Sequence, residues 1–377
     1  MTLPRVVIDS AILVTPRLLA LPVELIPIEG TRICSNDLRG VQALLTRTVT
    51  QVDSTLLEDS QIFFVGTASA GTDHIDTRYL AEQGISLASA AGCNAAAVAD
   101  YVLDAIYHCD RLESVINGAT VGLVGYGRVG RHLGARLASL GASVKVYDPF
   151  FEANGEDIQV CNLSEVLACS IVSLHAALHS DPLHASFQMI DRMAAKHVMP
   201  NALFINAGRG GLVTEEALHR MADKGVTLVL DTWPDEPEVP QTLLSKVAVA
   251  TPHIAGYTGT AKTNATDFLI NPCLRALDLE SSLEMNNPKE TEQVSVEVPA
   301  DSDIGGLMKV MEAVSRVAQD DSDFRRAWSK SPTPDNFEAQ RTNYRLRRQY
   351  SDLIISANST SSELHRLLGA AGFGGVS

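Results

Sequence analysis

The sequence predicts an α/β protein built on a doubly wound parallel sheet, and three observations support this fold class. Short apolar runs of strand length alternate with helical patterns through most of the chain. From residue 119 to 254 this alternation is regular, as in a parallel sheet covered on both faces. One apolar run, 121–124, leads directly into a glycine-rich turn that opens a helix pattern.

The bulk composition sets limits on the class of protein. The chain has 377 residues, of which 45% are hydrophobic, and this favours two or three cored domains over one. Its formal net charge of −15 argues against a nucleic-acid partner, which would require a basic surface. A local basic pocket for a phosphorylated metabolite remains compatible with that charge.

Cysteine usage and the N-terminus bear on location. The six cysteines are scattered without a C-x-x-C pair, so we expect no metal site and a reduced protein. The N-terminus meets Asp9 before any long apolar stretch, which predicts neither a signal peptide nor a membrane span. We therefore expect a cytoplasmic protein.

The elements follow in chain order. Residues 5–8 and 61–65 are typical of buried strands, and Asn94 is a good N-cap for a helix whose apolar face runs from Ala95 to Ile106. That helix could join two domains. Five further apolar runs then predict the strands of the regular block: 121–124, 144–147, 171–174, 203–205 and 228–230.

The C-terminal part has a different pattern. A polar, proline-bearing stretch at 285–293 is typical of a linker. Beyond it, alternation at Val294, Val296 and Val298 predicts a strand, and a helix face follows within 307–314. A second strand at 353–355 and a helix at 363–368 complete a small α+β tail domain without a chemical motif of its own.

The glycine-rich turn predicts a dinucleotide site. Gly125, Gly127 and Gly130 would let the chain turn tightly and approach a pyrophosphate, whose charge the backbone N–H groups near Arg128 and Val129 would bind. Asp148, at the end of the next strand, would accept from a ribose 2′-hydroxyl and repel a 2′-phosphate. Residues 149–151 contain no Arg or Lys, so NAD is favoured over NADP. The alternative is a glycine turn in an ordinary α/β protein.

Polar groups at later strand ends predict chemistry on a 2-hydroxy acid. Such an oxidation needs a cation for the carboxylate, a base for the hydroxyl proton and an anion that orients the base. Arg209, His253 and Glu236 offer these three functions. Taken singly, each has an ordinary alternative: a surface ion pair, a structural histidine and a solvated turn acid.

The array resembles the D-2-hydroxyacid dehydrogenase family, in which an Arg, a Glu and a His act together. The resemblance implies a Rossmann-type NAD domain, His253 as the proton acceptor, and a cofactor lined also by Ala207, Gly208, Asp231 and Gly256. Where relatives have His-Thr-Pro, this chain has His175, Ala176 and Ala177, so Ala176 would line the cofactor without a hydroxyl contact.

Loops at 46–50, 66–76 and 253–258 and the tail at 343–348 resemble a branch of this family whose substrate is a small phosphorylated hydroxy acid. The resemblance implies substrate contacts at Thr48, Ser69 and Tyr257, with ordinary loop hydrogen bonding as the alternative for Thr48 and Ser69. It also implies a homodimer. The implied domains are a flavodoxin-like substrate-binding lid domain (1–93 and 255–285), an NAD-binding domain (94–254) and a C-terminal dimerisation domain (286–377).

Two questions stay open at this stage. Arg341, Arg345, Arg347 and Arg348 form a basic cluster that could reach a substrate phosphate, across a dimer interface, or simply form a solvated helix face. The reaction could also be that of a relative acting on 3-phosphoglycerate or glycerate, or the chain could be an NAD-sensing regulator that uses the fold for binding alone.

Overall fold

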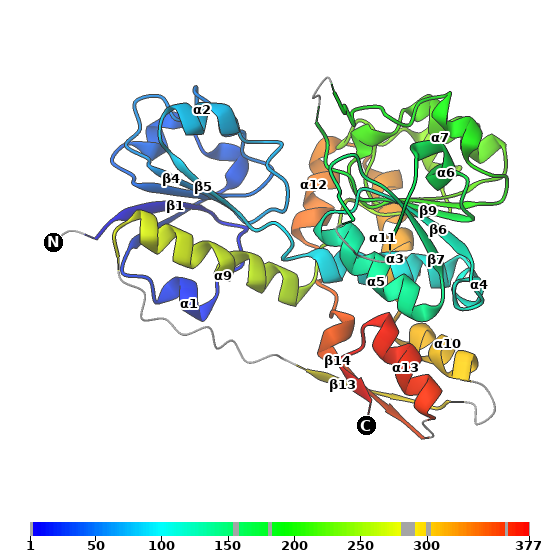
Figure 1. Cartoon of the computed structure of the whole chain (residues 1–377). Coiled ribbons are helices and arrows are strands. Elements are labelled where there is room, and N and C mark those ends of the chain that lie inside the picture. Colours follow the sequence, from blue (N-terminus) through cyan, green and yellow to red (C-terminus); the bar gives the residue numbers. More distant parts are fainter. Residues whose placement is uncertain are drawn as a thin grey trace. The chain divides into compact units, whose positions relative to one another are not determined.

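The structure is a computed structural model that describes residues 3–153, 158–179, 183–279, 291–298, 303–358 and 361–376. The chain divides into two compact units, each drawn in Figure 1. The first consists of Met1–Asn94 and Thr258–Pro288, and the second of Ala95–Tyr257 and Lys289–Ser377. The predicted boundaries at 93/94 and 254/255 fall within three residues of this division.

The first unit contains a five-stranded parallel sheet in the order β2-β1-β3-β4-β5. Consecutive residues Val6 and Val7 face opposite sides, as the pleat of a strand requires. On one side Val6 packs with Leu269 of α9, and on the other Val7 packs with Leu80 of α2. The elements are β1 Arg5–Asp9, α1 Pro16–Leu19, β2 Glu24–Ile28, η1 Gly30–Arg32, η2 Ser35–Leu38, β3 Ala43–Thr46, β4 Phe64–Thr67, α2 Thr77–Glu82, β5 Ser86–Ser89 and α9 Gly259–Ala276.

Of the two strands predicted here, 5–8 is confirmed as β1. The predicted strand at 61–65 begins later, at Phe64, and continues through Gly66 and Thr67. Phe63 is apolar but 39% exposed, and it lies outside the buried run. Apolar character alone therefore placed the start of this strand too early.

The second unit contains a seven-stranded parallel sheet in the order β12-β11-β10-β9-β6-β7-β8. From β6 the chain first adds β7 and β8 on one side and then β9 to β12 on the other. The switch point therefore lies between β6 and β9, and open α/β sheets bind ligands at such a point. The predicted doubly wound fold is confirmed. The strands are β6 Thr120–Val124, β7 Ser143–Tyr147, β8 Gln159–Val160, β9 Ile171–Leu174, β10 Leu203–Asn206, β11 Thr227–Leu230 and β12 Val249–Ala250. The helices are α3 Ala95–His108, α4 Leu112–Ile116, α5 Arg128–Leu140, α6 Leu163–Leu167, η3 Ala194–His197, η4 Gly210–Leu212, α7 Glu215–Asp223 and α8 Gln241–Leu244.

The five predicted strands and the helix at 95–106 all lie within these elements. The N-cap role predicted for Asn94 is wrong, because its side-chain oxygen accepts no hydrogen bond from any residue that the structure describes.

The C-terminal segment adds a three-stranded parallel sheet in the order β13-β14-β15 and four α-helices among the described residues. Its predicted helices and the strand at 353–355 are confirmed, and the strand predicted from Val294, Val296 and Val298 ends at Val296, whereas α11 and α12 were not anticipated. Most of the predicted linker lies outside the described residues. The elements are β13 Glu292–Val296, α10 Asp303–Val314, α11 Val317–Lys330, α12 Pro334–Thr342, η5 Tyr350–Asp352, β14 Leu353–Ala357, α13 Ser362–Ala371 and β15 Gly375–Val376.

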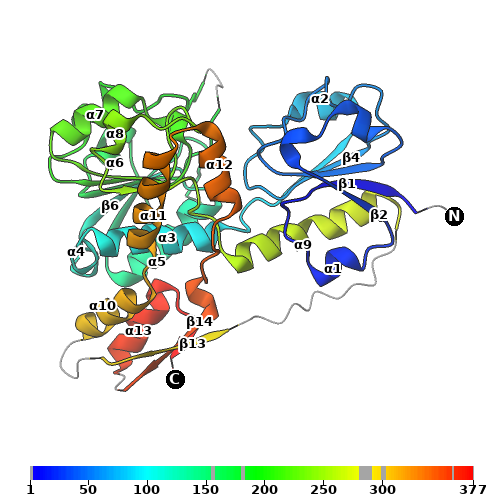
Figure 2. The ribbon, with the colours of Figure 1, turned by 180° about the vertical axis from the view of Figure 1, so that it is seen from behind.

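This C-terminal segment shares the apolar core of the dinucleotide-type sheet. Leu307 and Leu364 belong to the same cluster as Ile106 of α3, and α11 packs against α3 and β12 (Figure 2). Phe324 of α11 lies 6.0 Å from Trp233, ring centroid to centroid. The sequence-based division made 286–377 a domain of its own. In the structure, Lys289–Ser377 shares a core with residues 95–257 and belongs to the same compact unit.

Two buried carboxylates of α3 reinforce that junction. Asp104 accepts hydrogen bonds from the Ser315 hydroxyl and from the backbone amide of Arg316, at 2.9 Å. Asp100 pairs with Arg136 and accepts from the Tyr350 amide at 2.9 Å. Burial raises the pKa of both carboxyl groups. Their partners therefore come largely from the last quarter of the chain.

Within the part of the chain that is described, no helix combines the length and the apolar character that a membrane crossing requires. The same residues contain no cluster of three or more His, Cys, Asp or Glu that could hold a metal ion.

Candidate active site

The glycine turn joins β6 to α5, as predicted. Gly125 has a φ of +91°, and a Cβ there would lie 2.4 Å from the Ala176 amide nitrogen. A Cβ on Gly130 would lie 2.2 Å from the carbonyl oxygen of Gly125. Both positions therefore require glycine for packing, and Ala176 borders the turn.

Gly127 differs from the other two glycines. A Cβ added there would meet no described atom within 4 Å, although Gly127 is the N-cap residue of α5. The helix N-terminus that follows it, at Arg128 and Val129, presents backbone N–H groups and a partial positive charge. Gly127 thus keeps open a space in front of an anion-binding helix terminus, which suits the pyrophosphate of NAD.

Asp148 lies beside this turn. One carboxylate oxygen accepts from the Tyr126 amide at 2.7 Å and the other from the Phe150 amide at 2.9 Å. Each oxygen keeps a further lone pair for a ribose hydroxyl. The predicted acid is therefore held at the glycine turn, and its charge disfavours a 2′-phosphate.

The chain turns tightly after the next strands as well. A Cβ on Gly208 would lie 2.9 Å from the carbonyl oxygen of Leu174 at the end of β9. Asn206 accepts from the Gly208 amide at 3.2 Å and donates to the Arg209 carbonyl at 3.0 Å. Ala207, between them, is partly exposed. Asn206 was not predicted, and its place at a strand end is the feature that could have identified it.

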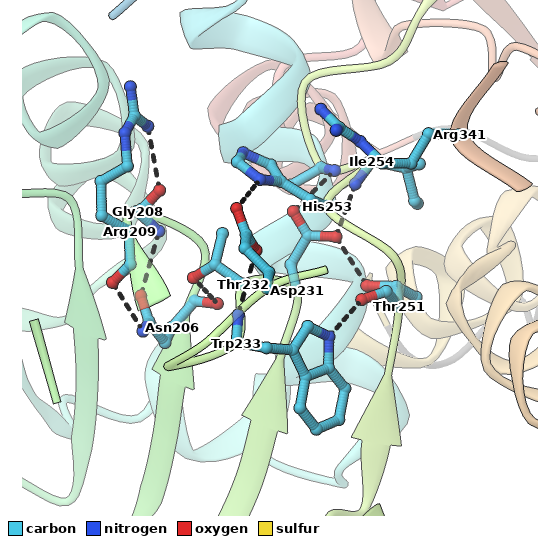
Figure 3. Close-up of polar contacts among 12 residues, drawn as sticks. Asn206, Gly208, Arg209, Asp231, Thr232, Trp233, Thr251, His253, Ile254 and Arg341 are labelled. Atoms are coloured by element: carbon cyan, nitrogen blue, oxygen red, sulfur yellow. Dashed lines mark hydrogen bonds and ion pairs between the residues drawn. The ribbon is translucent and has the colours of Figure 1, made fainter. Parts of the chain in front are cut away.

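His253 and Glu236 form a hydrogen-bonded pair, with Nδ1 of the histidine 2.7 Å from Oε1 of the glutamate (Figure 3). The other glutamate oxygen accepts from the Trp233 amide at 3.2 Å. Burial alone would raise the pKa of Glu236, but the adjacent His253 and the Trp233 amide bring it below its ordinary value. An ionised glutamate therefore orients the imidazole through Nδ1 and leaves Nε2 as the nitrogen for proton exchange.

The backbone of His253 is held in an unusual conformation by Asp231. His253 has a φ of +56°, and its amide donates to the Asp231 carbonyl at 2.7 Å. The buried Asp231 carboxylate accepts from the amides of Ile254 and Ala255, at 2.7 and 2.9 Å, and from the Thr251 hydroxyl at 2.7 Å. The resemblance implied a cofactor contact for Asp231, whereas the contacts observed here are those of a residue that shapes the histidine loop.

Arg209 follows the end of β10 and lies at the left of the cluster drawn in Figure 3, in which His253 lies near the centre. Its guanidinium donates to the Gly208 carbonyl at 3.0 Å. The three predicted catalytic side chains thus all come from carboxyl ends of neighbouring strands in one sheet.

Tyr257 follows Gly256, a partly exposed residue, in the same loop. Its hydroxyl accepts from Arg341 of α12 at 3.2 Å, and Arg341 also donates to both oxygens of Glu338, at 2.8 and 3.1 Å. The predicted basic cluster is therefore divided: Arg341 and Arg347 are largely buried, while Arg345 and Arg348 are exposed. A solvated helix face is wrong for this cluster, because α12 ends at Thr342 and the chain then turns inward.

The predicted substrate residues of the first unit are placed only within that unit. Thr48 is exposed in the loop after β3, and the Ser69 carbonyl, after β4, accepts from the Ser89 hydroxyl at 3.0 Å. The neighbouring Arg47 pairs with the buried Asp9 at 2.8 Å. Thr48 and Ser69 therefore remain predictions.

Two regions of the chain match models of known families. Residues 90–255 match the D-isomer specific 2-hydroxyacid dehydrogenase NAD binding domain, and residues 287–372 match a domain of unknown function, DUF3410. The model match ends two residues after His253, and the second match contains α12.

Named relatives align along almost the whole chain. An erythronate-4-phosphate dehydrogenase of Marinomonas sp. is 35% identical over 357 residues, covering 92% of this chain and 92% of the relative. One of Yersinia enterocolitica is 34% identical, covering 91% and 92%. The similarity therefore spans both units.

Solved structures share the fold at lower identity. NAD+-bound 3-phosphoglycerate dehydrogenase of Entamoeba histolytica has a TM-score of 0.63 at 19% identity, covering 76% of this chain and 99% of that one. The holo form of D-mandelate dehydrogenase from Rhodotorula graminis also has a TM-score of 0.63 at 19% identity, covering 73% and 94%. These structures support the arrangement of the elements alone.

Proposed function

We propose that this chain, which belongs to the erythronate-4-phosphate dehydrogenases within the D-isomer specific 2-hydroxyacid dehydrogenase family, oxidises 4-phospho-D-erythronate. As a member of that family it is an NAD-dependent oxidoreductase. The product would be (R)-3-hydroxy-2-oxo-4-phosphooxybutanoate, on the route to pyridoxal 5′-phosphate, the active form of vitamin B6. The observation that carries the chemistry is the His253–Glu236 pair, with 2.7 Å between ring nitrogen and carboxylate oxygen.

The mechanism assigns one task to each polar side chain. NAD, when bound, supplies the acceptor for the hydride that leaves C2 of the substrate. His253 accepts the hydroxyl proton at Nε2, and Glu236 stabilises the resulting imidazolium through Nδ1. Arg209 binds the substrate carboxylate and polarises the C2 oxygen. Loss of one hydride and one proton converts the 2-hydroxy acid to a 2-oxo acid, so atoms and charges balance.

The cofactor residues are proposed from the same geometry. The space over Gly127 and the amides of Arg128 and Val129 would receive the pyrophosphate, and Asp148 the adenosine ribose. Gly125 and Gly130 shape that turn, and we infer that Ala176, Ala207, Gly208 and Gly256 complete the cofactor surface, behind which the buried Asp231 shapes the histidine loop. Thr48, Ser69 and Tyr257 are proposed to contact the substrate.

A panel of acids tests the substrate. We expect kcat/KM with NAD, followed by NADH absorbance, to be highest for 4-phospho-D-erythronate, ahead of D-3-phosphoglycerate, D-glycerate and unphosphorylated D-erythronate. A higher value for 3-phosphoglycerate or glycerate would reassign the substrate. A protein that binds NADH but turns over none of the four would instead be a regulator.

We further propose that the protein forms a homodimer through its C-terminal segment. β13 is the outer strand of the sheet β13-β14-β15, so one of its edges pairs with no strand among the described residues, and such an edge can pair with another chain. Light scattering of the full chain should give twice the mass of 40.4 kDa. A mass equal to one chain at micromolar concentration would contradict the proposal.

A further inference from the structure

We infer that the C-terminal segment completes the active site of its own chain, with Arg341 as a positioning residue that holds the Tyr257 hydroxyl. This inference rests on the proposed function, because Tyr257 matters here as the residue that contacts the substrate. It gives the domain of unknown function at 287–372 a part in the reaction besides assembly.

The side-chain contact is well defined. One nitrogen of the Arg341 guanidinium donates to the Tyr257 hydroxyl at 3.2 Å, and the guanidinium carbon lies 5.9 Å from the centre of the Tyr257 ring. Glu338, one helical turn earlier, fixes the other guanidinium nitrogen through both of its carboxylate oxygens. Because the side chain of Arg341 is only 11% exposed, this arrangement is desolvated and directional.

These contacts argue against Arg341 as the arginine of the cluster that binds the substrate phosphate across a dimer interface. The Arg341 guanidinium is neutralised by Glu338 and turned toward Tyr257 within a single chain. Its action on a substrate would therefore be indirect, through the orientation of the tyrosine ring and hydroxyl.

The same segment also holds the backbone of the tyrosine loop. The Arg347 guanidinium donates to the Ala255 carbonyl, and the Arg347 amide donates to the Tyr257 carbonyl at 3.4 Å. Arg347 is buried, and its charge is balanced by the nearby Asp100, Asp104 and Asp320. Residues 341 and 347 thus contact both the side chain and the main chain of the loop that begins at His253.

A double-mutant cycle tests whether Arg341 acts through Tyr257. Arg341→Met should lower kcat/KM for 4-phospho-D-erythronate about tenfold, mainly by raising KM, because the tyrosine loses its orienting partner. In a Tyr257→Phe background the same substitution should cost less than about threefold. Equal losses in both backgrounds, or no loss in a folded Arg341→Met protein, would overturn the inference.

Arg341→Lys separates positioning from charge. Lysine keeps the positive charge near Glu236 but has no fork to bind Glu338 and Tyr257 together. We expect it to remain impaired in KM, whereas full recovery would show that charge alone is needed and would also overturn the inference. Should Arg341→Met fail to fold, the cycle is read with Arg341→Lys in the two backgrounds.

The control is Arg326→Met, an exposed arginine of α11 in the same segment that pairs with Asp323, and it should leave kcat, KM and NADH binding unchanged. A wrong substrate assignment can be distinguished from a wrong role for Arg341, because the double-mutant cycle can be measured with any acid of the panel that the wild type oxidises. If none is oxidised, the cycle is read on the calorimetric Kd of 4-phospho-D-erythronate with NADH present. A wild type that does not bind this compound would contradict both proposals.

Discussion

The glycine turn after β6 and the histidine loop after β12 both serve one sheet, but they are built in opposite ways. In the turn, backbone packs on backbone: Gly125 against Ala176, and Gly130 against Gly125. In the loop, carboxylate side chains fix the conformation: Asp231 accepts from main-chain amides, and Glu236 pairs with the imidazole of His253. The turn is therefore sensitive to an added atom, and the loop to a removed group.

The largest effect is expected at the proton acceptor. His253→Asn should lower kcat by about 10²–10⁴-fold, because the side chain proposed to accept the hydroxyl proton is replaced by an amide that cannot act as the base. Asparagine is chosen since it tolerates the positive φ of this position. Stopped-flow or steady-state NADH formation gives kcat, and NADH fluorescence should show an unchanged Kd. His219→Asn provides the matched control, because His219 pairs with Glu215 at 3.2 Å on the helix α7. Equal losses from the two variants would contradict the assignment.

Asp231→Asn tests the loop's dependence on one carboxylate. An amide in place of the carboxylate turns one acceptor into a donor that faces the amide of Ile254 or Ala255. We expect a loss of about 2 kcal/mol in the free energy of unfolding and a fall in kcat larger than that in NADH affinity. Urea unfolding and steady-state kinetics measure both. A stable variant with reduced NADH affinity alone would show a cofactor contact instead of a shaping role.

In the turn, two glycine substitutions should separate packing from ligand binding. Gly130→Ala should lower the thermal midpoint, because its methyl group would collide with the Gly125 carbonyl. Gly127→Ala should leave the midpoint of the ligand-free protein unchanged and weaken NADH binding about tenfold, because its methyl group occupies the space proposed for pyrophosphate. Differential scanning fluorimetry and fluorescence titration compare them. Unchanged NADH binding in Gly127→Ala would place the pyrophosphate elsewhere.

The smallest effect concerns pH. The pKa of Glu236 in the folded protein lies below the ordinary pKa of a glutamate. The ionised carboxylate therefore stabilises the fold at pH values above that ordinary pKa. This contribution is lost as the pH falls through the lowered pKa. The difference in unfolding free energy between wild type and Glu236→Gln should therefore favour the wild type at neutral pH and shrink on acidification. Urea melts at several pH values check this, and a difference that grows toward acid pH would contradict the sign.

The same contrast explains what the sequence could reveal. The glycine spacing encodes its own geometry, since Gly130 packs on Gly125 a few residues away and Gly125 packs on Ala176, just after the end of the adjacent strand. Strand ends likewise placed Arg209, Glu236 and His253 at one edge of the sheet. Partners that arrive from distant segments leave no local pattern. Arg341 reaches Tyr257 from α12, whose Phe337 packs on Phe324 of α11, which in turn packs on Trp233, and neither helix was anticipated from the sequence.

The substrate residues of the first unit illustrate a different limit. Thr48 and Ser69 are small polar residues in loops, where hydroxyl groups are common for many reasons. Only resemblance to a family distinguishes them.

The carboxylates of α3 have a consequence for the order in which this protein is made. A ribosome delivers Asp100 and Asp104 more than two hundred residues before the Tyr350 and Arg316 amides that they bind. Until then Asp104 lacks the hydroxyl and amide that it binds in the finished chain, and Asp100 has Arg136 but not the Tyr350 amide, so the contacts of these buried acids are incomplete. The seven-stranded sheet of the second unit is therefore synthesised before the C-terminal segment that completes its buried contacts. A gene shortened after residue 290 would therefore encode an unfinished nucleotide domain, whatever its effect on assembly.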